Sequence, residues 1–292
     1  MMPILLIGTS GQVGFELVRT LAPLGKVHGY DFPVLDLANP DAIAAVCRDV
    51  RPALIVNAAA YTAVDKAESE AQLARAINGV APGILAEEAK RLGAVLVHYS
   101  TEYVFDGAKR TPYTERDAPA PLNEYGRSKL AGDLAITASG CKHLIFRTTW
   151  VYGPRGRNFL LTMLSLAAAR EELRIVADQR GAPTSSLFLA EATARAIRSI
   201  PAQGIASGIY NLSAGGETTW AGFARAIFAR AGARPGFRVP RVLPIASSEY
   251  PTPARRPLYS VLSHRKFREA FGFAPADWET QLDQVFAKLP AS

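Results

Sequence analysis

The sequence predicts an α/β fold in which a doubly wound parallel sheet is joined to a smaller, irregular C-terminal lobe. Two observations lead to this prediction. Short apolar runs alternate with helical patterns through the first half of the chain, as in buried parallel strands joined by crossover helices. Beyond Tyr152, proline and glycine interrupt this regularity. We therefore expect a first domain over residues 1–152 and a second lobe over 153–292, with a helix near 187–199 returning to the first domain.

The individual elements follow from the spacing of the apolar residues. Apolar runs bounded by turn residues predict strands at 3–7, 26–30, 53–57, 94–99 and 143–147. Amphipathic spacing predicts crossover helices at 13–24, 41–50 and 71–91. Further helices are expected at 187–199, 220–231, 264–271 and 278–289, separated by turns that include the segment 201–208.

Composition and charge argue against several classes of function. With 49% hydrophobic residues among 292, the chain can bury a large core. No apolar run is long enough to span a bilayer, and the first strand is too short for a signal peptide, so we expect no membrane partner and a cytoplasmic location. The net charge of +7 comes from scattered basic residues without a nucleic-acid motif, so we expect no nucleic-acid partner. Cys47 and Cys141 are expected to be buried and reduced.

A glycine-rich turn follows the first predicted strand and opens the first predicted helix. Its sequence, Gly8-Thr9-Ser10-Gly11-Gln12-Val13-Gly14, has the spacing GxxGxxG. Any tight strand-to-helix turn favours glycine, but here the glycines also let the backbone approach a pyrophosphate whose charge the helix N-terminus stabilises. The position of the turn therefore indicates a Rossmann-type dinucleotide-binding domain, with cofactor contacts from Gly8, Gly11, Gln12, Val13 and Gly14.

Residues after the second and third strands bear on the choice of cofactor. Asp31 ends the second strand, where a carboxylate can accept hydrogen bonds from both adenosine ribose hydroxyls and repels a 2′-phosphate. This favours NADH, with an exposed turn aspartate as the alternative. Asp36 and Leu37 are expected to contact the adenine, although Asp36 could instead cap the following helix. The next strand ends in small residues that leave room for a flat cofactor or for tight helix packing, with expected contacts from Ala59, Ala60 and Tyr61.

A tyrosine and a lysine four residues apart supply candidate proton chemistry. Tyr125 and Lys129 share one face of a predicted helix, so the ammonium can approach the phenol and lower its pKa. Tyr125 could then protonate the alkoxide formed when a hydride reaches a ketone. Thr101, at the end of a preceding strand, could hydrogen-bond the same oxygen. A tyrosine and a lysine at this spacing occur by chance in many helices. The functional interpretation is favoured because the pair comes after the glycine turn and the strand-end acid along the chain.

The motifs in this order resemble those of the extended short-chain dehydrogenase/reductases and, within them, the dTDP-4-dehydrorhamnose reductases. Supporting stretches span residues 57–68, 99–107, 121–129, 147–153 and 178–184. The resemblance implies that NADPH or NADH reduces the C4 ketone of dTDP-4-dehydro-β-L-rhamnose to give dTDP-L-rhamnose for bacterial polysaccharide. Tyr125 would donate the proton, Lys129 would hold the nicotinamide ribose and Thr101 would polarise the ketone.

The same resemblance implies substrate contacts in the second half of the chain. Trp150 matches a position that packs on the sugar, although a large core residue at a lobe junction is the simpler alternative. Arginines suit phosphate oxygens, and asparagine is a further polar candidate. The weaker candidates for the nucleotide diphosphate are Asn158, Arg255 and Arg256.

Two features depart from the resemblance. Glu102 stands after Thr101 where the family usually has aspartate, so its contact with the sugar or with a loop amide is expected to differ by about a methylene length. Some relatives hold a magnesium ion between subunits through glutamates, and Glu16 and Glu191 occupy matching positions. No acidic partner at the C-terminus completes this set, so we assign no metal and leave Mg²⁺ unsupported.

Alternatives to this reaction remain open at this point. Another nucleotide-linked keto sugar could be the substrate, reduced alone or epimerised as well. The regulatory β subunit of methionine adenosyltransferase also resembles these reductases, so a non-catalytic dinucleotide-binding role is a second alternative. The sequence leaves both NADH and NADPH open, and a homodimer is a further open alternative.

Overall fold

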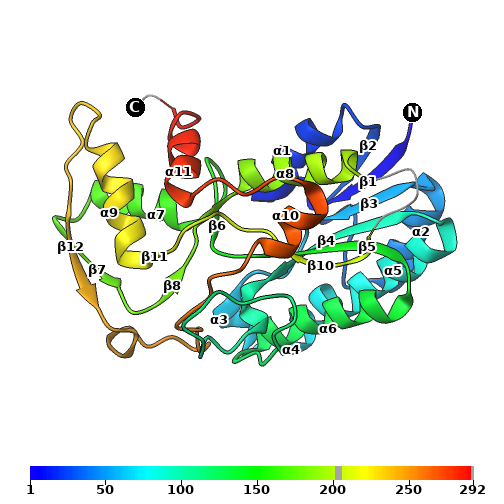
Figure 1. The fold of residues 1–292 in the computed structure, drawn as a ribbon, viewed down its shortest axis with the longest axis horizontal. Coiled ribbons are helices and arrows are strands. Elements are labelled where there is room, and N and C mark those ends of the chain that lie inside the picture. Colours follow the sequence, from blue (N-terminus) through cyan, green and yellow to red (C-terminus); the bar gives the residue numbers. More distant parts are fainter. Residues whose placement is uncertain (201–205, 291–292) are drawn as a thin grey trace.

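Parallel strands form the central sheet of the computed structural model, which describes residues 1–200 and 206–290 (Figure 1). The sheet has six strands in the order β10-β5-β4-β3-β1-β2. Their bounds are β1 (Pro3–Ile7), β2 (Lys26–Tyr30), β3 (Leu54–Asn57), β4 (Val95–Thr101), β5 (Lys142–Thr148) and β10 (Gly208–Asn211). The chain order reverses between β1 and β3, and such a switch point is where doubly wound sheets bind ligands.

The strand register brings the motif residues to one edge of the sheet. Ile7, the last residue of β1, pairs with Tyr30 of β2 and with Asn57 of β3. The segments that begin at Gly8, Asp31 and Ala58 therefore start at the same level. β1 and β3 are apolar and buried, as expected for strands covered by helices on both faces of a sheet.

Helices cover both faces of this sheet (Figure 1). One face packs against helices whose buried residues include Leu17, Leu189 and Phe267, and the other against helices that bury Ile43, Leu85 and Ile136. The first set comprises α1 (Gln12–Leu21), α8 (Ser186–Arg198) and α10 (Arg265–Phe271). The second comprises α2 (Pro40–Val50), α5 (Ala81–Leu92) and α6 (Glu124–Ser139).

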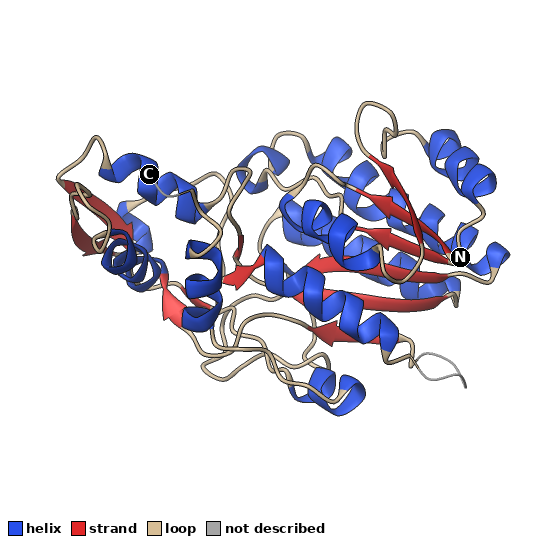
Figure 2. Ribbon diagram, turned by 90° about the horizontal axis from the view of Figure 1, so that it is seen from above, coloured by secondary structure: helices blue, strands red, loops and turns tan. Residues whose placement is uncertain are grey.

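The second lobe lies beyond the carboxyl edge of the sheet and has a core of its own (Figure 2). Its helices are α7 (Phe159–Ala167), α9 (Trp220–Ala231) and α11 (Trp278–Phe286). β7 (Glu172–Val176) pairs in parallel with β12 (Arg241–Ile245). Shorter pairs join β6 (Val151–Tyr152) to β9 (Thr184–Ser185), and β8 (Arg180–Gly181) to β11 (Thr218–Thr219). The remaining short helical elements are α3 (Val64–Ala67), α4 (Ala71–Arg75), η1 (Ala76–Val80), η2 (Glu102–Val104) and η3 (Ser247–Glu249).

Several segments differ from the sequence prediction. The helix expected at 71–91 is interrupted by η1, a π-helical turn, between α4 and α5. β10 was not predicted, because a four-residue run that begins with glycine has little strand signal until β5 pairs with it. The predicted turn segment 201–208 lies partly outside the described residues, which resume at 206.

The division of the chain at residue 152 stays a prediction. α8, β10 and α10 follow this point in sequence, yet all three pack in the first lobe. Contact between α8 and α1 agrees with the returning helix expected near 187–199. None of the helices in the described residues is long and apolar enough to cross a membrane.

Candidate active site

A cavity of about 440 Å³ opens at the switch point between β1 and β3. The glycine turn, the end of β2, the residues after β3 and the inner face of α6 contribute to its wall. Residues expected from the sequence that line it are Gly8, Gly11, Gln12, Val13, Asp31, Ala59, Ala60, Tyr125 and Lys129. The structure thus brings together residues from both ends of the first domain around a single cavity.

The glycine turn is shaped for close backbone approach. Gly8 has φ +90°, and a Cβ atom there would lie 2.6 Å from the amide nitrogen of Ala59. A Cβ atom on Gly14 would clash with the carbonyl oxygen of Gly8, so α1 can begin this close to the turn only with glycine. The amide end of α1 therefore faces the cavity, where it can hold a pyrophosphate. These features fit a dinucleotide cofactor.

Asp31 is held against the same turn. Its carboxylate accepts hydrogen bonds from the backbone amide of Ser10 at 2.6 Å and from that of Phe32 at 2.9 Å. Burial alone would raise the pKa of Asp31, but hydrogen bonds from Ser10 and its neighbours lower it below the usual value. The side chain is therefore a carboxylate at neutral pH, available to a ribose at the cavity wall.

Other predicted cofactor residues lie outside the cavity lining. Asp36 accepts a hydrogen bond from the amide of Ala38, and Leu37 is buried in the hydrophobic core. Gly14 acts through helix packing. The hydroxyl of Tyr61 donates to Glu70 at 2.6 Å, and this hydrogen bond raises the pKa of Tyr61 to about 12. Direct cofactor contact by these four residues stays a prediction.

Tyr125 and Lys129 lie on α6, whose start is fixed by an N-cap. Asn123 accepts a hydrogen bond from the amide of Gly126 at 2.8 Å and donates to the carbonyl of Arg255 at 2.7 Å. The helix therefore begins at a defined residue and presents Tyr125 and Lys129 to the cavity. Lys129 itself is only 1% exposed. Its ammonium donates to the carbonyl oxygen of Tyr99 at 2.6 Å and lies 3.1 Å from Nε2 of His98.

The predicted direction of the pKa shift of Tyr125 is wrong. Burial raises the pKa of this phenol above its usual value, the carboxylate of Glu102 raises it further, and Thr101 lowers it. Lys129 does not offset these effects, since its own hydrogen bonds are with His98 and Tyr99. Burial lowers the pKa of Lys129 to about 8, against the opposing charge of Asp133. Tyr125 is therefore a protonated phenol at neutral pH, which is the form that can donate a proton.

Thr101 and Glu102 follow β4 at the same edge of the sheet. Both are buried, and the hydroxyl of Thr101 donates to Oε2 of Glu102 at 2.8 Å. Burial raises the pKa of Glu102 to about 7, while hydrogen bonds from Thr101 and from backbone amides lower it. The ring of Tyr103 meets that of Tyr125 edge-on, with 5.4 Å between the centroids. The hydroxyl of Thr101 and the carboxyl of Glu102 therefore form a buried hydrogen-bonded pair at this edge of the sheet.

The predicted substrate residues of the second half lie in different settings. Trp150 has φ +42° and stacks on Trp220 with 3.6 Å between ring centroids. Asn158 caps α7 and donates to Oε1 of Gln12 at 3.0 Å. The guanidinium of Arg256 forms two hydrogen bonds with Asp65, at 3.0 and 2.9 Å. The side chain of Arg255 is exposed. Contacts of these residues with a nucleotide sugar stay predictions.

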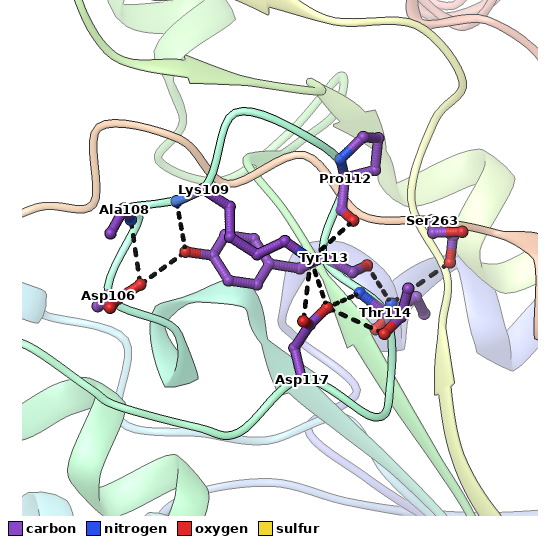
Figure 3. A network of polar contacts seen from close by, with 9 residues as sticks. Asp106, Ala108, Lys109, Pro112, Tyr113, Thr114, Asp117 and Ser263 are labelled. Atoms are coloured by element: carbon purple, nitrogen blue, oxygen red, sulfur yellow. Dashed lines mark hydrogen bonds and ion pairs between the residues drawn. The ribbon is translucent and has the colours of Figure 1, made fainter.

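The loop after η2 ties the end of β4 to the second half of the chain (Figure 3). The hydroxyl of Tyr113 donates to Asp106 at 2.6 Å, and Lys109 forms an ion pair with Asp117 at 2.8 Å. The backbone carbonyl of Tyr113 accepts a hydrogen bond from the amide of Ser263 at 2.8 Å. This network fixes the loop that immediately follows Thr101 and Glu102.

Comparison with known proteins gives the family. The family model described as RmlD substrate binding domain matches residues 1–290. A dTDP-4-dehydrorhamnose reductase of Burkholderia thailandensis is 50% identical over 284 residues, which cover 95% of either chain. The chain belongs to the dTDP-4-dehydrorhamnose reductase family. An Escherichia coli dTDP-4-dehydrorhamnose reductase is 46% identical over 294 residues, covering 99% of this chain and 98% of that one.

A solved structure supports the same relationship. The crystal structure of a dTDP-4-dehydrorhamnose reductase from Bacillus anthracis, in complex with NADP, is similar with a TM-score of 0.91 and 36% identity. The match covers 98% of this chain and 99% of that one. The resemblance and the Rossmann-type fold expected from the sequence are therefore confirmed.

Some residues around this dTDP-4-dehydrorhamnose reductase-type site were not expected from the sequence. Asp133 lies one turn beyond Lys129 and forms a buried ion pair with Arg147 at 3.2 Å. It continues the four-residue spacing of Tyr125 and Lys129, and that signal could have revealed it. His98 sits inside an apolar strand, and only the tertiary structure brings it to Lys129.

Glu16 and Glu191, the glutamates at positions that match a magnesium site between subunits, lie beside the same arginine. The guanidinium of Arg19 lies 2.8 Å from Glu191 and 4.0 Å from Glu16. A cationic side chain therefore already stands beside both glutamates. Within residues 1–200 and 206–290, no group of three or more His, Cys, Asp or Glu side chains could hold a metal ion.

Proposed function

We propose that this protein reduces the C4 ketone of dTDP-4-dehydro-β-L-rhamnose with NADPH or NADH, giving dTDP-L-rhamnose for bacterial polysaccharide biosynthesis. One observation carries the proposal. Tyr125 and Lys129 line the same cavity as the glycine turn, so a phenol able to donate a proton would lie beside a dinucleotide bound there. The names of the relatives supply the sugar nucleotide.

The residues of the site divide the reaction between them. A bound reduced nicotinamide supplies the hydride. Tyr125, protonated at neutral pH, donates its proton to the oxygen that becomes the C4 hydroxyl. Thr101 lies at the end of the adjacent strand, where its hydroxyl can donate to the same oxygen and stabilise the charge that develops there. Lys129, which donates to the carbonyl of Tyr99 and lies beside His98, would contact the nicotinamide ribose.

The remaining assignments accompany this reaction. Asp31 favours a ribose without a 2′-phosphate, whereas the Bacillus anthracis relative is in complex with NADP, so we include both cofactors. Trp150 and Arg256 are our candidates for contacts with the nucleotide sugar. We also propose a cytoplasmic location, which the buried free thiols of Cys47 and Cys141 favour, and a homodimer as the assembly to be examined.

Turnover with defined cofactors tests the proposal. The purified protein is mixed with enzymatically prepared dTDP-4-dehydrorhamnose and NADH or NADPH, and cofactor oxidation is followed by absorbance. Tyr125→Phe is expected to lose at least about 100-fold in kcat, as expected for loss of a general acid. Tyr210→Phe is the matched control, because the hydroxyl of Tyr210 donates to Ala206 and lies outside the cavity lining.

The outcomes separate this reaction from its alternatives. Turnover that Tyr125→Phe abolishes and Tyr210→Phe preserves supports the reductase. Absence of turnover with either cofactor, in a protein that binds the cofactor, would favour another keto sugar or a non-catalytic dinucleotide-binding role.

A further inference from the structure

Glu102 is a buried carboxyl that contacts the group assigned to polarise the ketone. It follows Thr101 directly in η2 and is 3% exposed. Oε2 of Glu102 lies 2.8 Å from the hydroxyl oxygen of Thr101. None of the ion pairs found among the described residues includes Glu102. Its buried charge therefore has hydrogen bonds as its only compensation.

The hydroxyl of Thr101 has a single proton to donate. Its oxygen accepts a hydrogen bond from the amide of Tyr103 at 3.2 Å and lies 2.8 Å from Oε2 of Glu102, where the protonation state of Glu102 decides which of the two groups donates. An ionised carboxylate can only accept hydrogen bonds, so the hydroxyl of Thr101 donates its single hydrogen bond to Glu102. Thr101 then has none for a substrate ketone. A protonated Glu102 can instead donate to Thr101, which frees the hydroxyl proton for the ketone oxygen.

The surroundings of Glu102 make its protonated form accessible at neutral pH. Burial raises its pKa to about 7, opposed by hydrogen bonds from Thr101, from its own amide and from the amide of Trp150. The phenols of Tyr103 and Tyr125 are ionisable groups whose pKa values Glu102 raises in turn. Beyond Tyr103 lies the ion pair between Arg256 and Asp65, two charges that compensate each other.

We propose that Glu102, in its protonated form, is the positioning residue that makes Thr101 a hydrogen-bond donor to the substrate ketone. The inference rests on the proposed function. It adds a dependence of the Thr101 hydrogen bond on the protonation state of Glu102, which Tyr125 and Lys129 do not provide. Ionisation of Glu102 withdraws the donor from the ketone while leaving Tyr125 protonated. The step involves no net proton transfer from Glu102: its proton stays in the hydrogen bond to Thr101, and Tyr125 supplies the proton that the product keeps.

The pH profile of kcat/KM tests this role, because it reports groups that ionise in the free enzyme. Wild-type activity is expected to fall between about pH 7 and about pH 8, approaching a tenfold loss per pH unit, before the charge of Lys129, with a pKa of about 8, is lost. In Glu102→Gln the amide donates to Thr101 at every pH, so this fall is expected to disappear over the same range. Glu102→Asp keeps an ionisable carboxyl and is expected to keep a pH-dependent fall. A wild-type profile that is flat from about pH 6 to about pH 8, or a Gln variant with the wild-type fall, would overturn the proposal.

A second measurement does not depend on turnover or on a variant that must fold. The wild-type protein is prepared with carboxyl-labelled glutamate, saturated with NADP⁺, and its infrared spectrum is recorded at about pH 6 and about pH 8. A band of protonated labelled carboxyl that disappears across this range supports the titration of Glu102, and its absence at both pH values contradicts it. Lack of turnover at every pH would refute the proposed function, while this band would still decide the state of Glu102.

Discussion

At the scale of single residues, the site is governed by burial more than by neighbouring charge. Burial lowers the pKa of Lys129 to about 8 and raises that of Glu102 to about 7. Both groups therefore become neutral more readily than they would in water. The same effect keeps the phenol of Tyr125 protonated, as a proton donor requires.

The raised pKa of Glu102 predicts a pH-dependent stability. A carboxyl whose pKa rises on folding stabilises the native state fully below its usual pKa of 4.5, and this contribution is lost as pH rises through about 7. Between these limits the wild type is expected to lose about 3 kcal/mol relative to Glu102→Gln, which does not titrate. Urea unfolding of both proteins at about pH 5 and about pH 8 measures the difference. An equal gap between the two proteins at both pH values would refute this prediction.

Asp31 predicts a change in cofactor preference. Its carboxylate repels the 2′-phosphate of NADPH, while the adenosine ribose of NADH can donate hydrogen bonds to it. Asp31→Ser is expected to raise the ratio of kcat/KM for NADPH to that for NADH by roughly tenfold. The ratio is independent of any general loss of activity. If it stayed at the wild-type value, Asp31 would not face the ribose.

At the scale of elements, α6 joins the reactive groups to a buried ion pair. Tyr125, Lys129 and Asp133 recur every four residues along the helix, and Asp133 pairs with Arg147 on β5. Both members of this pair are at most 2% exposed. The ion pair therefore joins α6 to the sheet at a point where water cannot replace either partner.

Removal of one partner should be costly. Asp133→Asn leaves the guanidinium of Arg147 buried without a carboxylate, and we expect a loss of about 3–5 kcal/mol in the free energy of unfolding. Thermal or urea unfolding gives the value. Glu269→Gln is the matched control, because it breaks the exposed ion pair with Arg265 and should cost less than about 1 kcal/mol. Equal losses in the free energy of unfolding for the two variants would mean that burial does not make the Asp133–Arg147 ion pair costlier to break than an exposed one.

A π-helical turn connects the cofactor loop to the same helix. Asn78, within η1, accepts a hydrogen bond from the amide of Tyr61 at 2.9 Å and donates to the hydroxyl of Ser128 at 3.0 Å. One side chain thus links the loop after β3 to α6. Such turns are frequent at functional sites, and the single helix expected at 71–91 did not include this one.

At the scale of the whole molecule, the sequence reveals the first lobe better than the second. Apolar runs predict β1, β3, β4 and β5 because these strands are largely buried. The pairing of β10 with β5 depends on residues more than 60 positions apart, so no local pattern predicts it. Several strands of the second lobe have only two residues each, and their pairing is likewise set by tertiary contacts.

The candidate site was predictable where chemistry follows from local order. The glycine turn, Asp31, Tyr125 and Lys129 stand at strand ends or on one helix face, and they reach the same cavity. The partners of Lys129 come from a separate strand, and the state of Tyr125 depends on burial by the whole fold. Three-dimensional packing sets those properties, so the spacing of Tyr125 and Lys129 predicted the wrong direction for the pKa shift of Tyr125.

The proposed reaction transfers a hydride from the nicotinamide to C4 of the sugar within this cavity. The most direct measurement uses NADH or NADPH carrying deuterium at the transferred position of the nicotinamide, with dTDP-4-dehydrorhamnose as substrate. We predict one deuterium at C4 of the dTDP-L-rhamnose formed, located by NMR, and none at other ring carbons. A product without deuterium at C4, or cofactor oxidation without reduction of the sugar, would contradict hydride transfer to C4.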